Sequence, residues 1–161
     1  APLKVGGSGI KTFEKTAPNS MPEHIEAGTV NSHSIAGLKA GLEFIQETGI
    51  SKIREKENML VKLFYDNIKD IKNIKIYCDF SVKERGPIVS VNLGNYSSSS
   101  VSDELFERFE IATRSGGHCA PLMHKALGTK KQGAVRFSFS YFNTEDEVLF
   151  AAKALKILGE E

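Results

Sequence analysis

The feature that most constrains this fold is the point at which periodic apolar spacing begins. Residues 1–33 carry seven glycines or prolines and show no sustained repeat of 2 or 3.6 residues. From Ile35 onward, apolar residues follow helical or strand spacing. The sequence therefore predicts an extended arm over residues 1–33 and a small folded domain over residues 34–161, long enough for one compact core.

Helical spacing recurs in several stretches of the predicted domain. The apolar stripe of residues 35–45 stops at Thr48-Gly49, where glycine suits a helix C-cap. A second helix is expected from about Ser51 to Ile71, a third over residues 101–110 and a short one over residues 120–127. The last helix begins at Thr144, because Thr144 and Glu147 match a capping box.

Strands alternate with these helices. The stretches IKIYC (74–78), PIVSVNL (87–93) and AVRFSFS (134–140) have the alternation and β-branched content of strands, and the first two favour a hairpin. Residues 111–114 are compatible with a fourth, short strand. The order of elements predicts an α/β fold of the α+β type, with a small, mostly antiparallel sheet covered by helices.

Charge and composition exclude several function classes. The 21 basic and 20 acidic residues give a net charge of +1, without the basic excess that nucleic-acid binding requires. No apolar run approaches the ~20 residues of a membrane span, and no secretory signal opens the chain. Two cysteines without a CxxC pair or a zinc-like cluster favour the cytoplasm and predict no metal site.

Cys119 is the candidate with the most reactive setting. It follows Arg114, a Gly-Gly pair and His118, so cationic groups that favour a thiolate stand beside it on a flexible loop. A buried, inert cysteine is the alternative, and we adopt it for Cys78, which ends an apolar strand without a basic neighbour.

Three other candidates carry weaker signals. Arg136 lies on the polar face of the strand over residues 134–140; a surface arginine is the simpler interpretation, yet a strand also holds a guanidinium well for binding a carboxylate. Thr29, after Gly28 and before a helix, offers donors to a phosphate. Lys125 stands beside a histidine but is most simply a solvated residue on a short helix.

Four stretches together resemble a known family. They are GGSG (6–9), EAGTVNSHSIAGLKAGLEFI (26–45), ATRSGGHCAPLMHKALGT (112–129) and GAVRFSFSYFNTEDEV (133–148). Along essentially the whole chain, they resemble the C-terminal part of the class V aminotransferase superfamily, and most of all the cysteine desulfurases, which are pyridoxal-phosphate enzymes of fold type I. The most specific element is Arg-Ser-Gly-x-His-Cys.

The resemblance implies a role for each candidate residue. Cys119 matches the nucleophile that takes sulfur from L-cysteine, leaving L-alanine and a persulfide. Arg136 matches the arginine that holds the substrate carboxylate, Arg114 matches a second arginine nearby, and His118 is their neighbour. Thr29 matches a threonine that reaches the cofactor phosphate of the other subunit in a homodimer. A sulfur-acceptor protein is a further implied partner.

The resemblance also implies what this stretch does not contain. The family's cofactor-binding lysine lies upstream of its GGSG stretch, and Lys125 does not match it. We therefore expect a fragment that is inactive alone, in which residues 1–33 link to a missing large domain. Alternatives remain a selenocysteine lyase, an aminotransferase or an epimerase of the same superfamily, and a non-catalytic domain for dimerisation or docking.

Overall fold

A computed structural model describes residues 6, 7, 9, 11, 13–16, 18–82 and 85–161. The chain divides into two compact units, residues 1–48 and 49–161, which are treated separately below. The arm and the domain that spacing predicts, residues 1–33 and 34–161, stay predictions. Within the arm, residues 1–5, 8, 10, 12 and 17 lie outside the described residues.

The first unit contains a single regular element among its described residues, helix α1 (Ser32–Thr48). Asn31 begins it by accepting a hydrogen bond on Oδ1 from the Ser34 amide at 3.0 Å. The helix ends before Gly49, whose φ of 86° belongs to the left-handed region that favours glycine. The predicted apolar stripe is present and exposed on this helix: Ile35, Leu38, Leu42 and Ile45.

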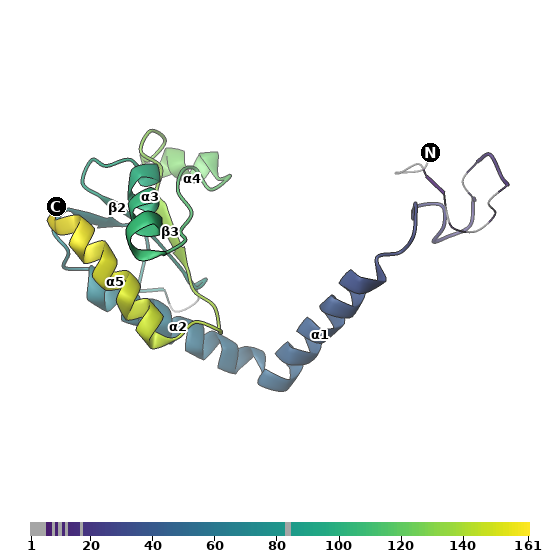
Figure 1. The fold of residues 1–161 in the computed structure, drawn as a ribbon, viewed down its shortest axis with the longest axis horizontal. Coiled ribbons are helices and arrows are strands. Elements are labelled where there is room, and N and C mark those ends of the chain that lie inside the picture. Colours follow the sequence, from purple (N-terminus) through teal and green to yellow (C-terminus); the bar gives the residue numbers. More distant parts are fainter. Residues whose placement is uncertain (1–5, 8, 10, 12, 17, 83–84) are drawn as a thin grey trace. The chain divides into compact units, whose positions relative to one another are not determined.

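The second unit is built on a three-stranded sheet (Figure 1). The strands are β1 (Ile74–Ile76), β2 (Ile88–Leu93) and β3 (Val135–Ser138), in the order β1-β2-β3. Both pairings are antiparallel, and Ser90 of β2 stands opposite Arg136 of β3. The predicted hairpin and the mostly antiparallel sheet are therefore confirmed. The stretch over residues 111–114 forms only one isolated bridge, between Arg114 and Arg136.

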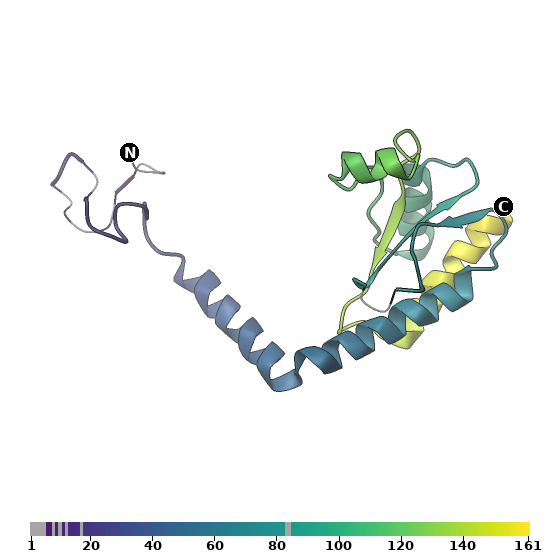
Figure 2. The same ribbon diagram turned by 180° about the vertical axis from the view of Figure 1, so that it is seen from behind.

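Three helices supply the apolar layer against this sheet: α2 (Ile50–Ile68), α3 (Ser98–Phe109) and α5 (Glu145–Glu160). Figure 2 shows α2 and α5 lying side by side, as they do from the opposite direction in Figure 1. Phe64 of α2 lies at the centre of the core, with its ring centroid 4.7 Å from that of Phe137 and 5.1 Å from that of Phe139. The fold class expected from the sequence is thus confirmed.

Two helix boundaries illustrate how local chemistry sets the elements. Thr144 and Glu147 form the predicted capping box, in which each side chain accepts a hydrogen bond from the other residue's amide. By contrast, α2 stops at Ile68, three residues before the predicted end. Ile71 is buried but lies in the turn that leads to β1, where its amide donates to the Ile68 carbonyl. The predicted helix was too long because Ile71, an apolar residue of a buried turn, falls by chance at the spacing expected for a helix.

Candidate active site

The loop that carries Cys119 starts from the edge of the sheet. The amide of Arg114 donates to the Arg136 carbonyl at 3.2 Å, and the amide of Arg136 donates to the Arg114 carbonyl at 2.8 Å. The chain then turns at Gly116 and enters helix α4 (Pro121–Ala126), where proline suits the first turn. The loop is therefore anchored at the strand and at a helix start.

His118 and Cys119 adopt an uncommon backbone conformation within this loop. Their φ angles are 52° and 57°, in the left-handed region that non-glycine residues rarely occupy. Such conformations persist only where surrounding contacts impose them, and they cluster at functional sites. Here the His118 ring contributes one of these contacts, because its Nε2 lies 3.0 Å from the Arg114 carbonyl oxygen.

The Cys119 thiol is exposed and stands beside a guanidinium. Arg114 Nη2 donates a hydrogen bond to Cys119 Sγ at 3.2 Å. The two residues line an open hollow of about 510 Å³ together with His118, His124 and Lys130. An accessible sulfur beside a fixed positive charge is the setting in which a thiolate acts as a nucleophile.

Arg136 is brought to the same side of the sheet as Arg114. Residues opposite each other in an antiparallel bridge point to the same face, so both side chains leave the face that is not packed against the helices. Arg136 Nε is buried without a hydrogen-bond partner, and neither arginine forms an ion pair with any carboxylate that the structure describes. The Arg136 guanidinium, and the nitrogens of Arg114 that do not bond Cys119, thus remain available to an anion.

A buried histidine behind the loop was missed by the sequence reasoning. His124 of α4 is only 2% exposed, its Nδ1 lies 2.7 Å from Thr129 Oγ1, and its ring packs edge-on against that of His118, with centroids 5.2 Å apart. The available signal was helical position, since neighbouring residues of a helix lie about 100° apart around its axis, so His124 need not share the exposure of Lys125.

The turn before β3 also supports the loop. Ser98 Oγ accepts a hydrogen bond from the Gly116 amide at 3.1 Å and donates one to the Gln132 carbonyl at 2.8 Å. Gly133 packs so closely that a Cβ there would meet Ser98 Oγ and would lie 2.8 Å from Gly116 Cα. Only glycine allows these two backbone segments to approach in this way.

The remaining predicted residues lie apart from this cluster or belong to the other unit. Cys78 is partly buried and packs against the core, with its thiol 3.7 Å from the Ile88 carbonyl oxygen. Lys125 is exposed on α4, as its sequence position suggested. Thr29 is exposed in a bend of the first unit, after Gly28 with a φ of 87°.

Two further classes of site were sought over the part of the chain that the structure describes. No group of three or more His, Cys, Asp or Glu side chains there is arranged to hold a metal ion. No helix in that part is both long and apolar enough to cross a lipid bilayer.

Comparison with known proteins gives a consistent family signal. The family model for aminotransferase class-V matches residues 1–150. Cysteine desulfurases of Klebsiella pneumoniae and Haloferax volcanii are 33% and 30% identical to the chain, over 92% and 91% of its length. The chain spans 36% and 34% of those two relatives, about a third of their length.

A solved structure supports the same assignment. The cysteine desulfurase of Thermococcus onnurineus, determined in its apo form, aligns with 99% of this chain at a TM-score of 0.81 and 29% identity. The chain covers 39% of that structure. The fold described above is therefore shared with that part of the cysteine desulfurase.

Proposed function

Because this chain belongs to the aminotransferase class-V family, we propose that it forms the sulfur-accepting part of a pyridoxal-phosphate-dependent cysteine desulfurase. One observation carries the proposal: the exposed Cys119 thiol accepts a hydrogen bond from Arg114, which is itself bridged to Arg136. A nucleophile and two anion-binding groups thus occupy one edge of the sheet. An amino acid that bears both a carboxylate and a sulfur matches this set.

Cys119 is proposed as the nucleophile. Its thiolate attacks the sulfur of the substrate L-cysteine, so that an S–S bond forms as the substrate Cβ–S bond breaks. The electron pair of the Cβ–S bond stays with Cβ, which takes up one proton and becomes the methyl group of L-alanine, while the substrate sulfur is left on Cys119 as a persulfide. The carbon is reduced as the two sulfurs are oxidised, so no external oxidant is needed. Arg114, 3.2 Å from Sγ, supplies positive charge beside both the thiolate and the persulfide.

Arg136 is proposed to hold the substrate carboxylate. Strand β3 fixes its backbone on both sides, and its guanidinium forms no ion pair with any of the described carboxylates. A planar guanidinium on a rigid strand suits bidentate binding. His118 is proposed as a positioning residue, because its ring bonds the Arg114 carbonyl and so holds the loop in the conformation that presents Cys119.

The described residues fit only one side of a pyridoxal-phosphate site. The exposed Thr29 hydroxyl, after a left-handed Gly28, suits a contact to the cofactor phosphate of a neighbouring subunit in a homodimer. Lys125 stands on the exposed side of α4 and is not proposed to bind the cofactor. When bound, pyridoxal phosphate would supply an electron sink for the reacting carbon. We place its lysine in the part of the relatives' length that this chain does not span.

Two further features follow from the proposed chemistry. A persulfide on an exposed loop is a carrier, so a second protein with a thiol is the proposed sulfur acceptor. Both cysteines of this chain are free, which suits a reducing compartment such as the cytoplasm.

The experiment that tests the proposal uses the full-length parent protein with pyridoxal phosphate and L-cysteine. L-alanine release and the mass of the peptide that contains Cys119 are followed for the wild type, Cys119→Ala and Cys78→Ala. We expect L-alanine and one added sulfur on the Cys119 peptide in the wild type and in Cys78→Ala. Both should be lost in Cys119→Ala.

The other superfamily activities give a different pattern. An aminotransferase or an epimerase does not need the thiol, so turnover of an amino acid that survives Cys119→Ala would reject the desulfurase proposal in favour of one of them. A wild-type protein that releases L-alanine from L-selenocysteine but not from L-cysteine would be a selenocysteine lyase. A domain that only docks would give neither product.

A further inference from the structure

Charge is distributed unevenly between the Cys119 region and the rest of the chain. Residues 111–144 contain five of the 21 basic residues and none of the 20 acidic ones, which gives this segment a formal charge of +5. The remainder therefore carries −4, which accounts for the net charge of +1. The balanced overall composition thus conceals a basic segment around the thiol.

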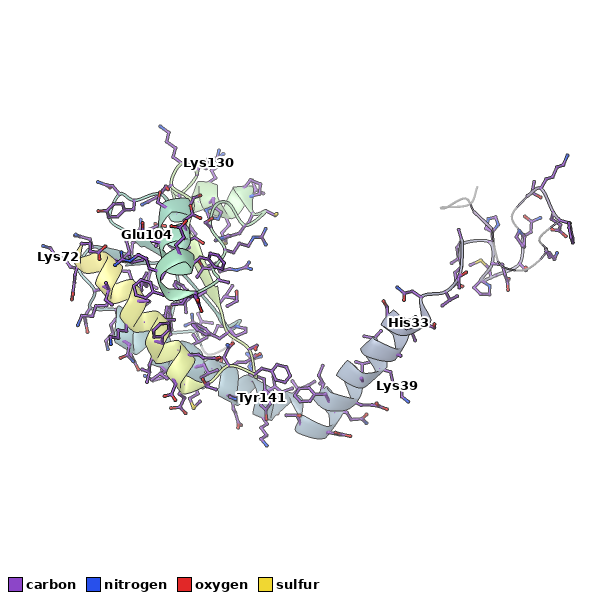
Figure 3. All side chains as sticks on the ribbon, viewed as in Figure 1. His33, Lys39, Lys72, Glu104, Lys130 and Tyr141 are labelled. Atoms are coloured by element: carbon purple, nitrogen blue, oxygen red, sulfur yellow. The ribbon has the colours of Figure 1, made fainter. Side chains whose placement is uncertain are left out.

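The proposed reaction accounts for only two of those five cations. Arg114 and Arg136 lie at the thiol and at the proposed carboxylate position. The other three cations are the exposed lysines of the segment: Lys125, Lys130 and Lys131. None of these three lysines forms an ion pair with a carboxylate that the structure describes. Lys130 lines the same hollow as Cys119, and Figure 3 shows its side chain projecting away from the body of the unit.

Exposed apolar side chains accompany these lysines. Leu122 and Met123 of α4 are 81% and 46% exposed, whereas His124 on the same helix is buried and holds it in place. We define the acceptor patch as Cys119, Leu122, Met123, Lys125, Lys130 and Lys131. Exposed apolar side chains, methionine among them, are typical of a protein interface, whereas a phosphate backbone is bound chiefly by cations and polar donors.

We propose that the acceptor patch docks an acidic protein surface that presents the thiol receiving sulfur from Cys119. This inference rests on the proposed function and specifies its acceptor. In the transfer, the acceptor thiolate attacks the outer sulfur of the Cys119 persulfide and forms a new S–S bond. The S–S bond to Cys119 breaks, and Cys119 leaves as a thiolate beside Arg114. Carboxylates around the acceptor thiol would face the three lysines, which raises the encounter rate and selects against basic partners.

The test uses probe thiols and requires no desulfurase turnover. Cys119 of the full-length parent protein, in a Cys78→Ser background, is converted to a mixed disulfide with 2-thiopyridine, a neutral leaving group. Three probes then displace it: a peptide with one cysteine between glutamates, a peptide of equal length with lysines instead, and an oligoribonucleotide with a terminal thiol and the charge of the first peptide. Release of thiopyridine gives each second-order rate constant.

We expect the acidic peptide to react roughly tenfold faster than the basic one at low ionic strength. The preference should vanish in high salt and should reverse in the triple variant Lys125→Glu/Lys130→Glu/Lys131→Glu. A second triple variant with glutamine at these positions should abolish the preference without introducing repulsion between new charges. Leu122→Ser should slow the acidic peptide but not the oligoribonucleotide.

Equal rates for the two peptides, or a preference that is indifferent to salt, would overturn the proposal. An oligoribonucleotide that reacts as fast as the acidic peptide would also overturn it, since the patch would then recognise polyanions in general. Failure of the parent protein to release L-alanine would reject the proposed function, whereas the peptide preference would still report on the patch.

Discussion

The two faces of the three-stranded sheet are made by alternate residues of the same strands, yet one face packs against the helices and the other carries residues of the proposed site. Val135 and Phe137 of β3 point into the core beside Phe64, while Arg136 between them leaves the opposite face beside Arg114. The packed face holds the strand in place and so fixes the backbone position of Arg136. Residues that stabilise the core therefore alternate along β3 with a residue of the proposed site.

The comparison predicts that the packed face tolerates change least. Phe64→Ala removes a ring that is 0% exposed and contacts two other aromatic rings, so we expect a loss of about 3–5 kcal/mol in unfolding free energy. Urea denaturation of the parent protein, followed by circular dichroism, measures it. Phe106→Ala, at a side chain that is 62% exposed, is the matched control and should shift the midpoint little. Similar losses in both variants would contradict the assigned core.

Adjacent residues of β3 should show opposite phenotypes. Arg136→Gln should lower kcat/KM for L-cysteine by roughly 100-fold, since a charge-assisted contact to the carboxylate is lost, and should leave the unfolding midpoint unchanged. Phe137→Leu should lower the midpoint and spare kcat/KM. Steady-state kinetics and denaturation on both variants check this pair. If Arg136→Gln has the kcat/KM of the wild type, Arg136 does not bind the substrate carboxylate.

The contrast can be sharpened further at the two cysteines. Arg114→Gln removes the donor at 3.2 Å from Cys119 Sγ, so we expect alkylation of Cys119 by iodoacetamide to slow several-fold. Cys78, which packs against the core, serves as the internal control and should label slowly in both proteins. Peptide mass spectrometry over time separates the two sites. Parallel slowing at both cysteines would indicate a general structural change instead.

A smaller effect is expected at the start of α5, which closes the packed face. Thr144→Ala removes the cap that bonds the Glu147 amide at 3.2 Å and should cost about 1 kcal/mol. Thermal unfolding measures the change. Ser99→Ala, at an exposed position of α3, is a suitable control, because Ser97 rather than Ser99 caps that helix. An equal cost at both positions would argue against the capping role.

The smallest effect is one of pH at the same cap. Glu147 accepts hydrogen bonds from the Thr144 amide and from Asn143, which hold its pKa below the ordinary value of 4.5. Its contribution to stability is therefore present above pH 4.5 and is lost as the pH falls through the lower pKa of the folded state. The difference in unfolding midpoint between wild type and Glu147→Gln should shrink on acidification. A difference that grows would contradict the sign.

How much could be predicted from sequence follows from the range of the interactions. The capping box and the antiparallel hairpin depend on residues that are close in sequence, and both are confirmed. The placement of Arg136 beside Arg114 depends on a bridge across 22 residues, and the support of the loop by Ser98 spans 18. Spacing alone cannot predict these contacts. The resemblance to cysteine desulfurases indicated which residues to examine, whereas His124 became apparent only from its burial.

The anchoring of the Cys119 loop sets a limit on how far its sulfur can travel. Gly116 is held at one end by Ser98, and Ala120 at the other by the start of α4, while the amides of residues 117–119 donate to no described acceptor. At about 3.5 Å per extended residue, the tip of this tether reaches on the order of 7 Å from either anchor. In the proposed transfer, a recipient would therefore have to bring its own thiol to the loop while both anchors hold.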